Sequence, residues 1–158
     1  MSDERKKFMK AAIRLANRSM RRNTGGPFGC VIVKDGKVIA RASNSVTRQC
    51  DPTAHAEVVA IRKACRKLKT FQLDDCELYC SCEPCPMCLS AIYWARPSKV
   101  YYAATRSDAA FAGFDDDLIY HEILRDPSER KIPFERMMET DALTLLAKWK
   151  EKPDKINY

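Results

Sequence analysis

The feature that most constrains this fold is a dense run of cysteines, Cys-Ser-Cys-Glu-Pro-Cys-Pro-Met-Cys, from Cys80 to Cys88. It holds four of the eight cysteines of the chain, and the other four are scattered singly. Disulfide scaffolds are usually shorter and secreted. The distribution therefore favours a metal site in a reducing compartment, with the scattered cysteines acting as small apolar side chains.

A second segment, Asp-Pro-Thr-Ala-His-Ala-Glu, supplies His55 and Glu57 upstream of this run. A catalytic zinc ion takes three protein ligands and leaves a fourth position for water. His55, Cys85 and Cys88 form such a set, and a Cys-x-x-Cys pair at a helix start favours thiolates. Glu57 is placed to exchange protons with the water, so one zinc ion per chain and hydrolytic chemistry are predicted.

One alternative is a structural zinc site made of Cys80, Cys82, Cys85 and Cys88, which would make His55 incidental. Against it, Cys80 and Cys82 fall at the end of a predicted strand, and structural sites usually use two separated pairs. A histidine with glutamate two residues on, followed by Pro-Cys-x-x-Cys, is typical of zinc deaminases. The sequence thus favours the three-ligand site with Glu57 as the catalytic acid and base. The other histidine, His121, has no such neighbours and is expected on the surface.

Helical and strand patterns alternate along the chain. They predict a five-turn helix ending before Asn23, strands 28–33 and 38–43 around the Asp35-Gly36 turn, helix 52–68 with His55 and Glu57 in its first turn, strand 76–81, helix 87–95, strand 100–104, helices 107–113 and 118–124, strand 134–138 and helix 140–151. We expect one α/β domain over 1–158, a three-layer α/β/α sandwich with a mixed five-stranded sheet and helices on both faces. No signal-peptide core or long apolar run is present, which predicts a cytoplasmic protein.

The net charge of +7 is concentrated at the start of the chain. Residues 1–22 carry eight basic and two acidic side chains. A basic helix can be the footprint of a nucleic-acid binder. The basic residues are not interleaved with aromatic residues, however, so a solvated helix face is the favoured interpretation.

On these segments the chain resembles the cytidine/deoxycytidylate deaminase superfamily, and within it the small bacterial-type guanine deaminases. The resemblance is nearly full-length and includes Gly25 to Gly29, Asp51 to Glu57, Ser81 to Cys88, Tyr93 to Pro97, Gly113 to Asp116 and Tyr158. The zinc motif is common to the superfamily, whereas Gly-Phe-Asp-Asp and the aromatic terminus are the guanine-specific part. The resemblance implies a cytidine deaminase-like fold and the conversion of guanine to xanthine and ammonia.

The resemblance also implies which residues contact the base. It places Asn44, Asp116 and the backbone near Ala56 at the base, with Asp116 sharing the proton transfer of Glu57. A purine needs flat apolar surfaces. The aromatic candidates are Phe28, Trp94, Phe114 and Tyr158. Phe28, Trp94 and Phe114 could equally be core residues.

Family resemblance further implies a homodimer in which residues 140–158 are exchanged, so that Tyr158 closes the pocket of the partner. The expected partner is a small nucleobase and not a membrane, while a nucleic acid is disfavoured but left open. Three features depart from the family: Cys80 where a hydroxyl residue is commoner, an additional Asp117, and the basic first helix. The basicity leaves a tRNA adenosine deaminase as the alternative, with guanosine, cytosine or pterin-like substrates further options.

Overall fold

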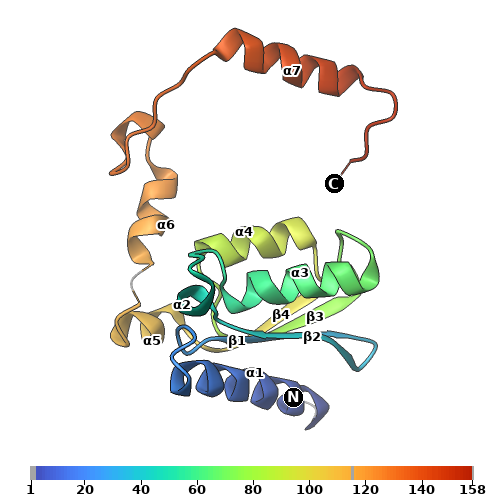
Figure 1. Cartoon of the computed structure of the whole chain (residues 1–158), viewed down its shortest axis with the longest axis vertical. Helices are drawn as coiled ribbons and strands as arrows, with labels where there is room; N and C mark the ends of the chain where they lie inside the picture. The colour runs from blue at the N-terminus through green and yellow to red at the C-terminus, as the bar shows by residue number, and fades with distance from the viewer. Residues whose placement is uncertain (1–2, 115, 158) are drawn as a thin grey trace. The chain divides into compact units, whose positions relative to one another are not determined.

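The structure is a computed structural model that describes residues 3–114 and 116–157. The chain divides into two compact units, Met1–Asp116 and Asp117–Tyr158. Within the first unit, four strands form one sheet in the order β2-β1-β3-β4 (Figure 1). Their bounds are β1 Gly29–Lys34, β2 Lys37–Ser43, β3 Cys76–Cys82 and β4 Lys99–Ala104. β1 is antiparallel to β2 and β3, while β3 is parallel to β4, so the sheet is mixed as predicted.

Helices cover both faces of this sheet (Figure 1). α1 (Asp3–Arg21) lies on one face, and α3 (Ala56–Leu68) and α4 (Pro86–Ala95) lie side by side on the other. Successive side chains of a strand point to opposite faces. Val31 of β1 accordingly packs with α1, whereas Ile32 packs in the cluster that includes α3. The three-layer α/β/α arrangement expected from the sequence is confirmed for this unit.

Two glycines are required by the local geometry. The hairpin between β1 and β2 turns at Asp35 and Gly36, with φ of 50° and 70°, as a tight turn of mirror-image type demands. At Gly29, a Cβ atom would lie 2.2 Å from the carbonyl oxygen of Ala12. Glycine therefore allows α1 to approach β1 closely.

The segments that connect these layers contain two short helices, α2 (Val46–Gln49) and α5 (Arg106–Phe111). α3 begins at Ala56, because residues 52 and 53 form a turn and His55 is the N-cap. The predicted helix 52–68 thus starts four residues too early, and His55 lies just before the first helical turn, while Glu57 lies in it.

The second unit contains α6 (Asp117–Leu124), a 3₁₀ turn (Pro127–Glu129) and α7 (Glu139–Glu151). The predicted fifth strand at 134–138 is wrong: this segment has no regular structure, and the sheet has four strands. A strand needs a neighbour that accepts its backbone hydrogen bonds, and the apolar pattern of these residues alone does not provide one. No residue from 117 to 157 is buried. Among the described residues, no helix has the length and apolar character needed to cross a membrane.

Candidate metal centre

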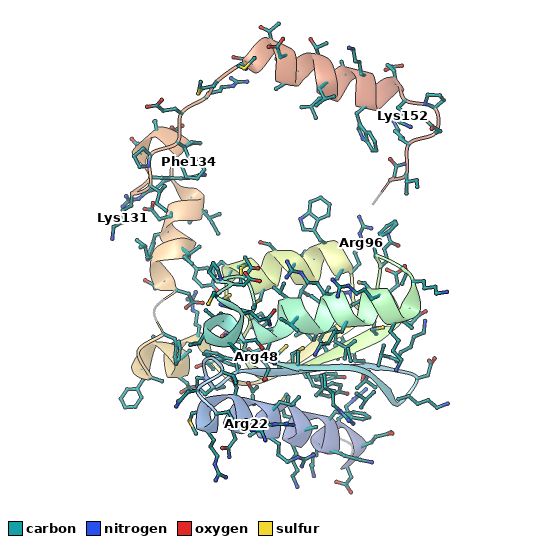
Figure 2. The ribbon with its side chains drawn as sticks, viewed as in Figure 1. Arg22, Arg48, Arg96, Lys131, Phe134 and Lys152 are labelled. Carbon is teal, nitrogen blue, oxygen red and sulfur yellow. The ribbon has the colours of Figure 1, made fainter. Side chains whose placement is uncertain are left out.

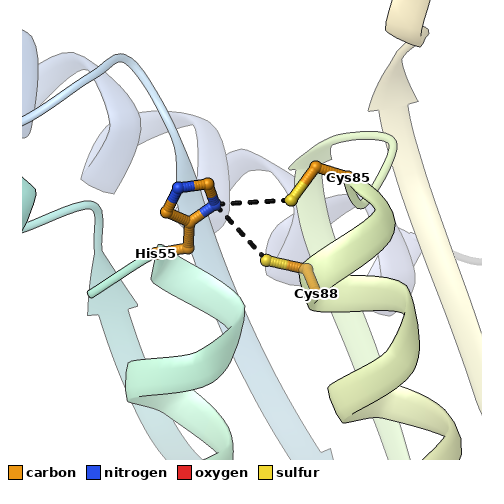
Figure 3. A group of neighbouring side chains, drawn as sticks. All are labelled: His55, Cys85 and Cys88. Atoms are coloured by element: carbon orange, nitrogen blue, oxygen red, sulfur yellow. Dashed lines mark hydrogen bonds between the residues drawn. The ribbon is translucent and has the colours of Figure 1, made fainter. Parts of the chain in front are cut away.

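The predicted ligands His55, Cys85 and Cys88 come together at the N-terminal ends of α3 and α4 (Figure 3). Nδ1 of His55 lies 3.5 Å from Sγ of Cys85 and 3.5 Å from Sγ of Cys88. All three potential ligand atoms lie within 4.8 Å of one another. His55 and Cys85 are the N-caps of their helices, and Pro86 occupies the first helical position after Cys85.

These distances fit a zinc ion. Zn–S bonds of about 2.3 Å and Zn–N bonds of about 2.0 Å at tetrahedral angles place sulfur and nitrogen about 3.5 Å apart. Two thiolates and one imidazole are also a donor set that zinc prefers. The side chains can thus hold a zinc ion in the arrangement that they already have.

The electrostatics of the two thiols support metal binding. Hydrogen bonds from Cys88 and then from His55 lower the pKa of Cys85 to about 4. The same contact with Cys85, together with burial, raises the pKa of Cys88. The hydrogen bond to Cys85 raises the pKa of His55. The two thiols of Cys85 and Cys88 therefore release their first proton readily. Loss of a thiol proton is the first step in binding a metal through thiolates.

Glu57 lies beside this centre in the first turn of α3. Its side chain is buried, and its Oε2 lies 3.5 Å from Sγ of Cys88. Burial raises the pKa of Glu57 above its usual value. A buried carboxyl group with a raised pKa next to a metal centre is suited to accept and return a proton near neutral pH.

The structure separates the other two cysteines of the run from the metal centre. Sγ of Cys80 is directed across the strand pair to Sγ of Cys30, at 3.9 Å. Sγ of Cys82 lies 3.5 Å from the carbonyl oxygen of Thr105. Among the described residues, the group able to hold a metal consists of His55, Cys85 and Cys88. The four-cysteine alternative is therefore not supported.

Asn44, predicted to contact the base, is buried and firmly held. Its Oδ1 accepts hydrogen bonds from the backbone N–H groups of Gly26 (3.3 Å) and Val46 (3.2 Å). Its carbonyl oxygen accepts a bond of 2.7 Å from Oγ of Ser19 in α1. A Cβ atom at Gly25 would lie 2.2 Å from Oδ1 of Asn44, so the glycine leaves room for this side chain.

Ser19 was not among the predicted site residues. The sequence did contain a signal, since Ser19 continues the buried positions Phe8, Ala12 and Ala16 at helical spacing. A hydroxyl group on the apolar face of a helix needs a hydrogen-bond partner. The sequence alone does not identify Asn44 as this hydrogen-bond partner, because the contact depends on how α1 packs on the sheet.

Two predicted aromatic residues form a pair. The rings of Phe28 and Phe114 meet edge to face with centroids 4.8 Å apart. A Cβ atom at Gly26 would lie 3.0 Å from Phe28 and 3.2 Å from Phe114. Since Gly26 also bonds to Asn44, the structure brings Phe28, Phe114 and Asn44 to one turn.

The remaining predicted residues differ in their positions. Ala56 is fully buried at the first position of α3, and Asp116 is near enough to His55 to raise its pKa electrostatically. Trp94 is 62% exposed and lies nine residues beyond Cys85 in α4, or about 13 Å along the helix. The structure thus does not bring Trp94 to the metal centre of its own chain. Tyr158 lies outside the described residues.

Comparison with known proteins adds independent evidence. The family described as "Cytidine and deoxycytidylate deaminase zinc-binding region" matches residues 2–104. The chain is 56% identical over 151 residues to guanine deaminase of Bacillus subtilis, covering 96% of this chain and 97% of that protein. It is 47% identical over 97 residues to a tRNA-specific adenosine deaminase of Aquifex aeolicus, covering 61% and 64%.

Solved structures give the same result. The crystal structure of the Bacillus subtilis guanine deaminase superposes with a TM-score of 0.94 at 54% identity, covering 100% of this chain and 99% of that one. A guanine deaminase structure from Nitrosomonas europaea superposes with a TM-score of 0.67 at 31% identity, covering 73% and 65%. With the zinc-binding region matched and its three ligands in place, the chain belongs to the cytidine and deoxycytidylate deaminase family.

Proposed function

We propose that this chain catalyses the hydrolytic deamination of guanine to xanthine and ammonia. The observation that carries the proposal is the similarity to Bacillus subtilis guanine deaminase, which extends over 96% of the chain and so includes the part beyond residue 104. The zinc motif is shared by deaminases of different substrates, whereas this similarity covers the segment Gly113 to Asp116 as well. Guanine is therefore favoured over other bases.

A tRNA adenosine deaminase is the less favoured alternative. The Aquifex aeolicus enzyme matches 61% of this chain and 64% of its own length. The resemblance to tRNA deaminases thus covers a smaller part of the chain than the resemblance to guanine deaminase.

The reaction that we propose uses His55, Cys85 and Cys88 to hold zinc, which when bound would activate a water molecule. The oxygen of the attacking water forms a bond to C2 of guanine. Glu57 takes a proton from that water at its carboxylate and returns it to a ring nitrogen beside C2. Glu57 then delivers the second proton to the exocyclic amine. The C2–N bond breaks, ammonia leaves, and a carbonyl group remains at C2.

The proposed contacts to guanine follow from what each group can donate or accept. Oδ1 of Asn44 is occupied by two backbone N–H groups, so Nδ2 is the atom that would donate to the base. The N–H group of Ala56, at the start of α3, is a further donor. Asp116 would accept from guanine N–H groups and assist Glu57. Phe28 and Phe114 would pack against the purine ring.

We also propose a cytoplasmic homodimer in which each 158-residue chain is one functional domain. All eight cysteines are free, as a reducing compartment requires. From 117 to 157 no residue is buried, and large apolar side chains are exposed. In α7 these are Leu143, Leu145, Leu146 and Trp149. Such side chains need a cover, and exchange of residues 140–158 between two copies would supply one and place Tyr158 over the pocket of the partner.

The proposed substrate is tested by ammonia release from a panel of guanine, guanosine, cytosine, adenine and tRNA, with the zinc-loaded full-length chain. We expect turnover of guanine and little or none of the other four. Turnover of tRNA without turnover of guanine would replace the proposal by its alternative. Zinc content measured on the same sample separates a wrong substrate from an unloaded enzyme.

A further inference from the structure

The outer face of α1 carries five cations in one line, Lys7, Lys10, Arg14, Arg18 and Arg21, which we call the α1 stripe. Residues three and four apart lie on the same side of a helix. All five side chains are exposed. The stripe covers fourteen residue steps, or about 21 Å at the rise of an α-helix.

The stripe is held in a fixed orientation. The opposite side of α1, with Phe8, Ala12, Ala16 and Ser19, is buried. Phe8 packs against Val31, Val33 and Tyr79 of the sheet. Figure 2 shows side chains of α1 projecting away from the sheet, with Arg22 just beyond the helix end. The cationic line is therefore presented outward on a rigid element.

The α1 stripe has no charge partner within the part of the chain that the structure describes. Other cations of the first unit do have one: Arg5 pairs with Glu77 at 3.6 Å, and Lys34 pairs with Asp75 at 3.3 Å. Like charges three and four residues apart destabilise a helix. Five aligned cations that the chain does not neutralise are thus complementary to an external polyanion.

We propose that the α1 stripe binds the phosphate backbone of a nucleic acid without reading its sequence. Phosphates in a strand form a regular line of negative charge, which a straight line of cations can match without base contacts. A membrane surface is less favoured, because a helix that binds a bilayer inserts its apolar face. In α1 that face is already packed on the sheet.

This binding is separate from deamination, since none of the stripe residues belongs to the metal centre or to the proposed guanine contacts. The C-terminal end of α1 leads directly into the Gly25-Gly26 turn beside Asn44. A nucleic acid on the stripe would thus hold the enzyme on that polymer while the free base remains the substrate. In this proposal the nucleic acid holds the enzyme in place and is not its substrate.

The test is fluorescence anisotropy of a labelled 20-nucleotide uridine RNA with the zinc-loaded full-length chain, over a range of salt concentrations. A variant with all five stripe residues changed to Gln removes the charges and keeps good helix formers. The matched control changes five exposed cations elsewhere to Gln, so that both variants carry the same net charge. These control positions are Lys37, Arg41, Arg66, Lys69 and Lys99.

We expect the logarithm of the wild-type binding constant to fall with the logarithm of salt concentration with a slope of about −3.5, which five neutralised phosphates of a single strand give. The stripe variant should lose at least about a hundredfold in affinity at low salt, and the control less than about threefold. Both variants should keep guanine turnover. An equal loss of RNA affinity in the two variants would show that net charge alone causes the binding, and it would overturn the proposal.

Two further outcomes would also overturn it. One is the absence of RNA binding by the wild type at low salt. The other is binding to vesicles with anionic headgroups, measured by co-sedimentation, at protein concentrations where RNA is not bound. In that second outcome the partner of the stripe is a lipid surface.

Discussion

The two units of this chain differ in how they use apolar side chains. In the unit before 117, alternate residues of β1 enter two buried clusters, one under α1 and one under α3. In the unit from Asp117 onward, no described residue is buried, although α6 and α7 carry many large apolar side chains. Burial of apolar area is the main favourable term in folding. The first unit obtains it within itself, whereas the described residues of the second unit bury none of their side chains.

This contrast separates two requirements of the proposed enzyme. The metal centre and Glu57 are supplied entirely by α3 and α4, which pack in the first unit. The residues assigned to closing the pocket belong to the second. Substitutions in the first unit should therefore impair zinc binding or proton transfer. Substitutions in the second unit should instead impair closure of the pocket over the substrate.

The largest effect is expected from Cys88→Ala, which removes a ligand from the first unit. Zinc should fall from about one ion per chain to near zero, and deamination should be lost. Cys80→Ala is the matched control, because that thiol contacts Cys30 instead. Metal analysis by mass spectrometry checks both. Loss of zinc in both variants would restore the four-cysteine site, because Cys80 and Cys88 are both ligands in that alternative.

Glu57→Gln should keep zinc and lower kcat by about 10²–10⁴-fold, because the amide cannot accept the proton. Ammonia release and zinc content are measured on the same preparation. The control is Glu135→Gln, an exposed carboxylate of the second unit, which should retain full turnover. Retained activity in Glu57→Gln would remove this residue from the mechanism.

A chain ending at Asp116 tests the division between the units directly. It should still bind zinc, because the ligands and the core that holds them precede residue 117. Its kcat/KM should fall about 10²-fold, the scale of loss when substrate is no longer held in position. Gel filtration should show a monomer. Wild-type activity in this chain would show that the second unit is dispensable.

Ser19→Ala should have the smallest effect. It removes the hydroxyl group that bonds the carbonyl oxygen of Asn44. Loss of one such bond is worth about 1 kcal/mol, so KM for guanine should rise about fivefold with kcat nearly unchanged. Ser98→Ala removes a similar bond, to the carbonyl oxygen of Cys76, and should leave KM unaltered. An equal rise in KM in both variants would indicate general destabilisation.

Much of the first unit could be predicted because its signals are local. The Asp35-Gly36 turn, the apolar runs of β1 and β3 and the helix start within one residue of Pro86 depend on neighbours in sequence. The fifth strand could not be predicted correctly, because strand formation at 134–138 depends on a hydrogen-bonding neighbour. The position of Trp94 away from its own metal centre follows from the length of α4 once the helix is known.

The residues proposed for the chemistry are recognisable from their order along the chain alone, because a histidine, a glutamate two residues on and a Pro-Cys-x-x-Cys pair are typical of zinc deaminases. Tertiary structure decided which of the clustered cysteines take part. The cross-strand register of β1 and β3 pairs Cys80 with Cys30. The side-by-side packing of α3 and α4 brings Cys85 and Cys88 to His55 (Figure 1). Contacts between segments thirty residues apart arise only when the helices share one face of the sheet.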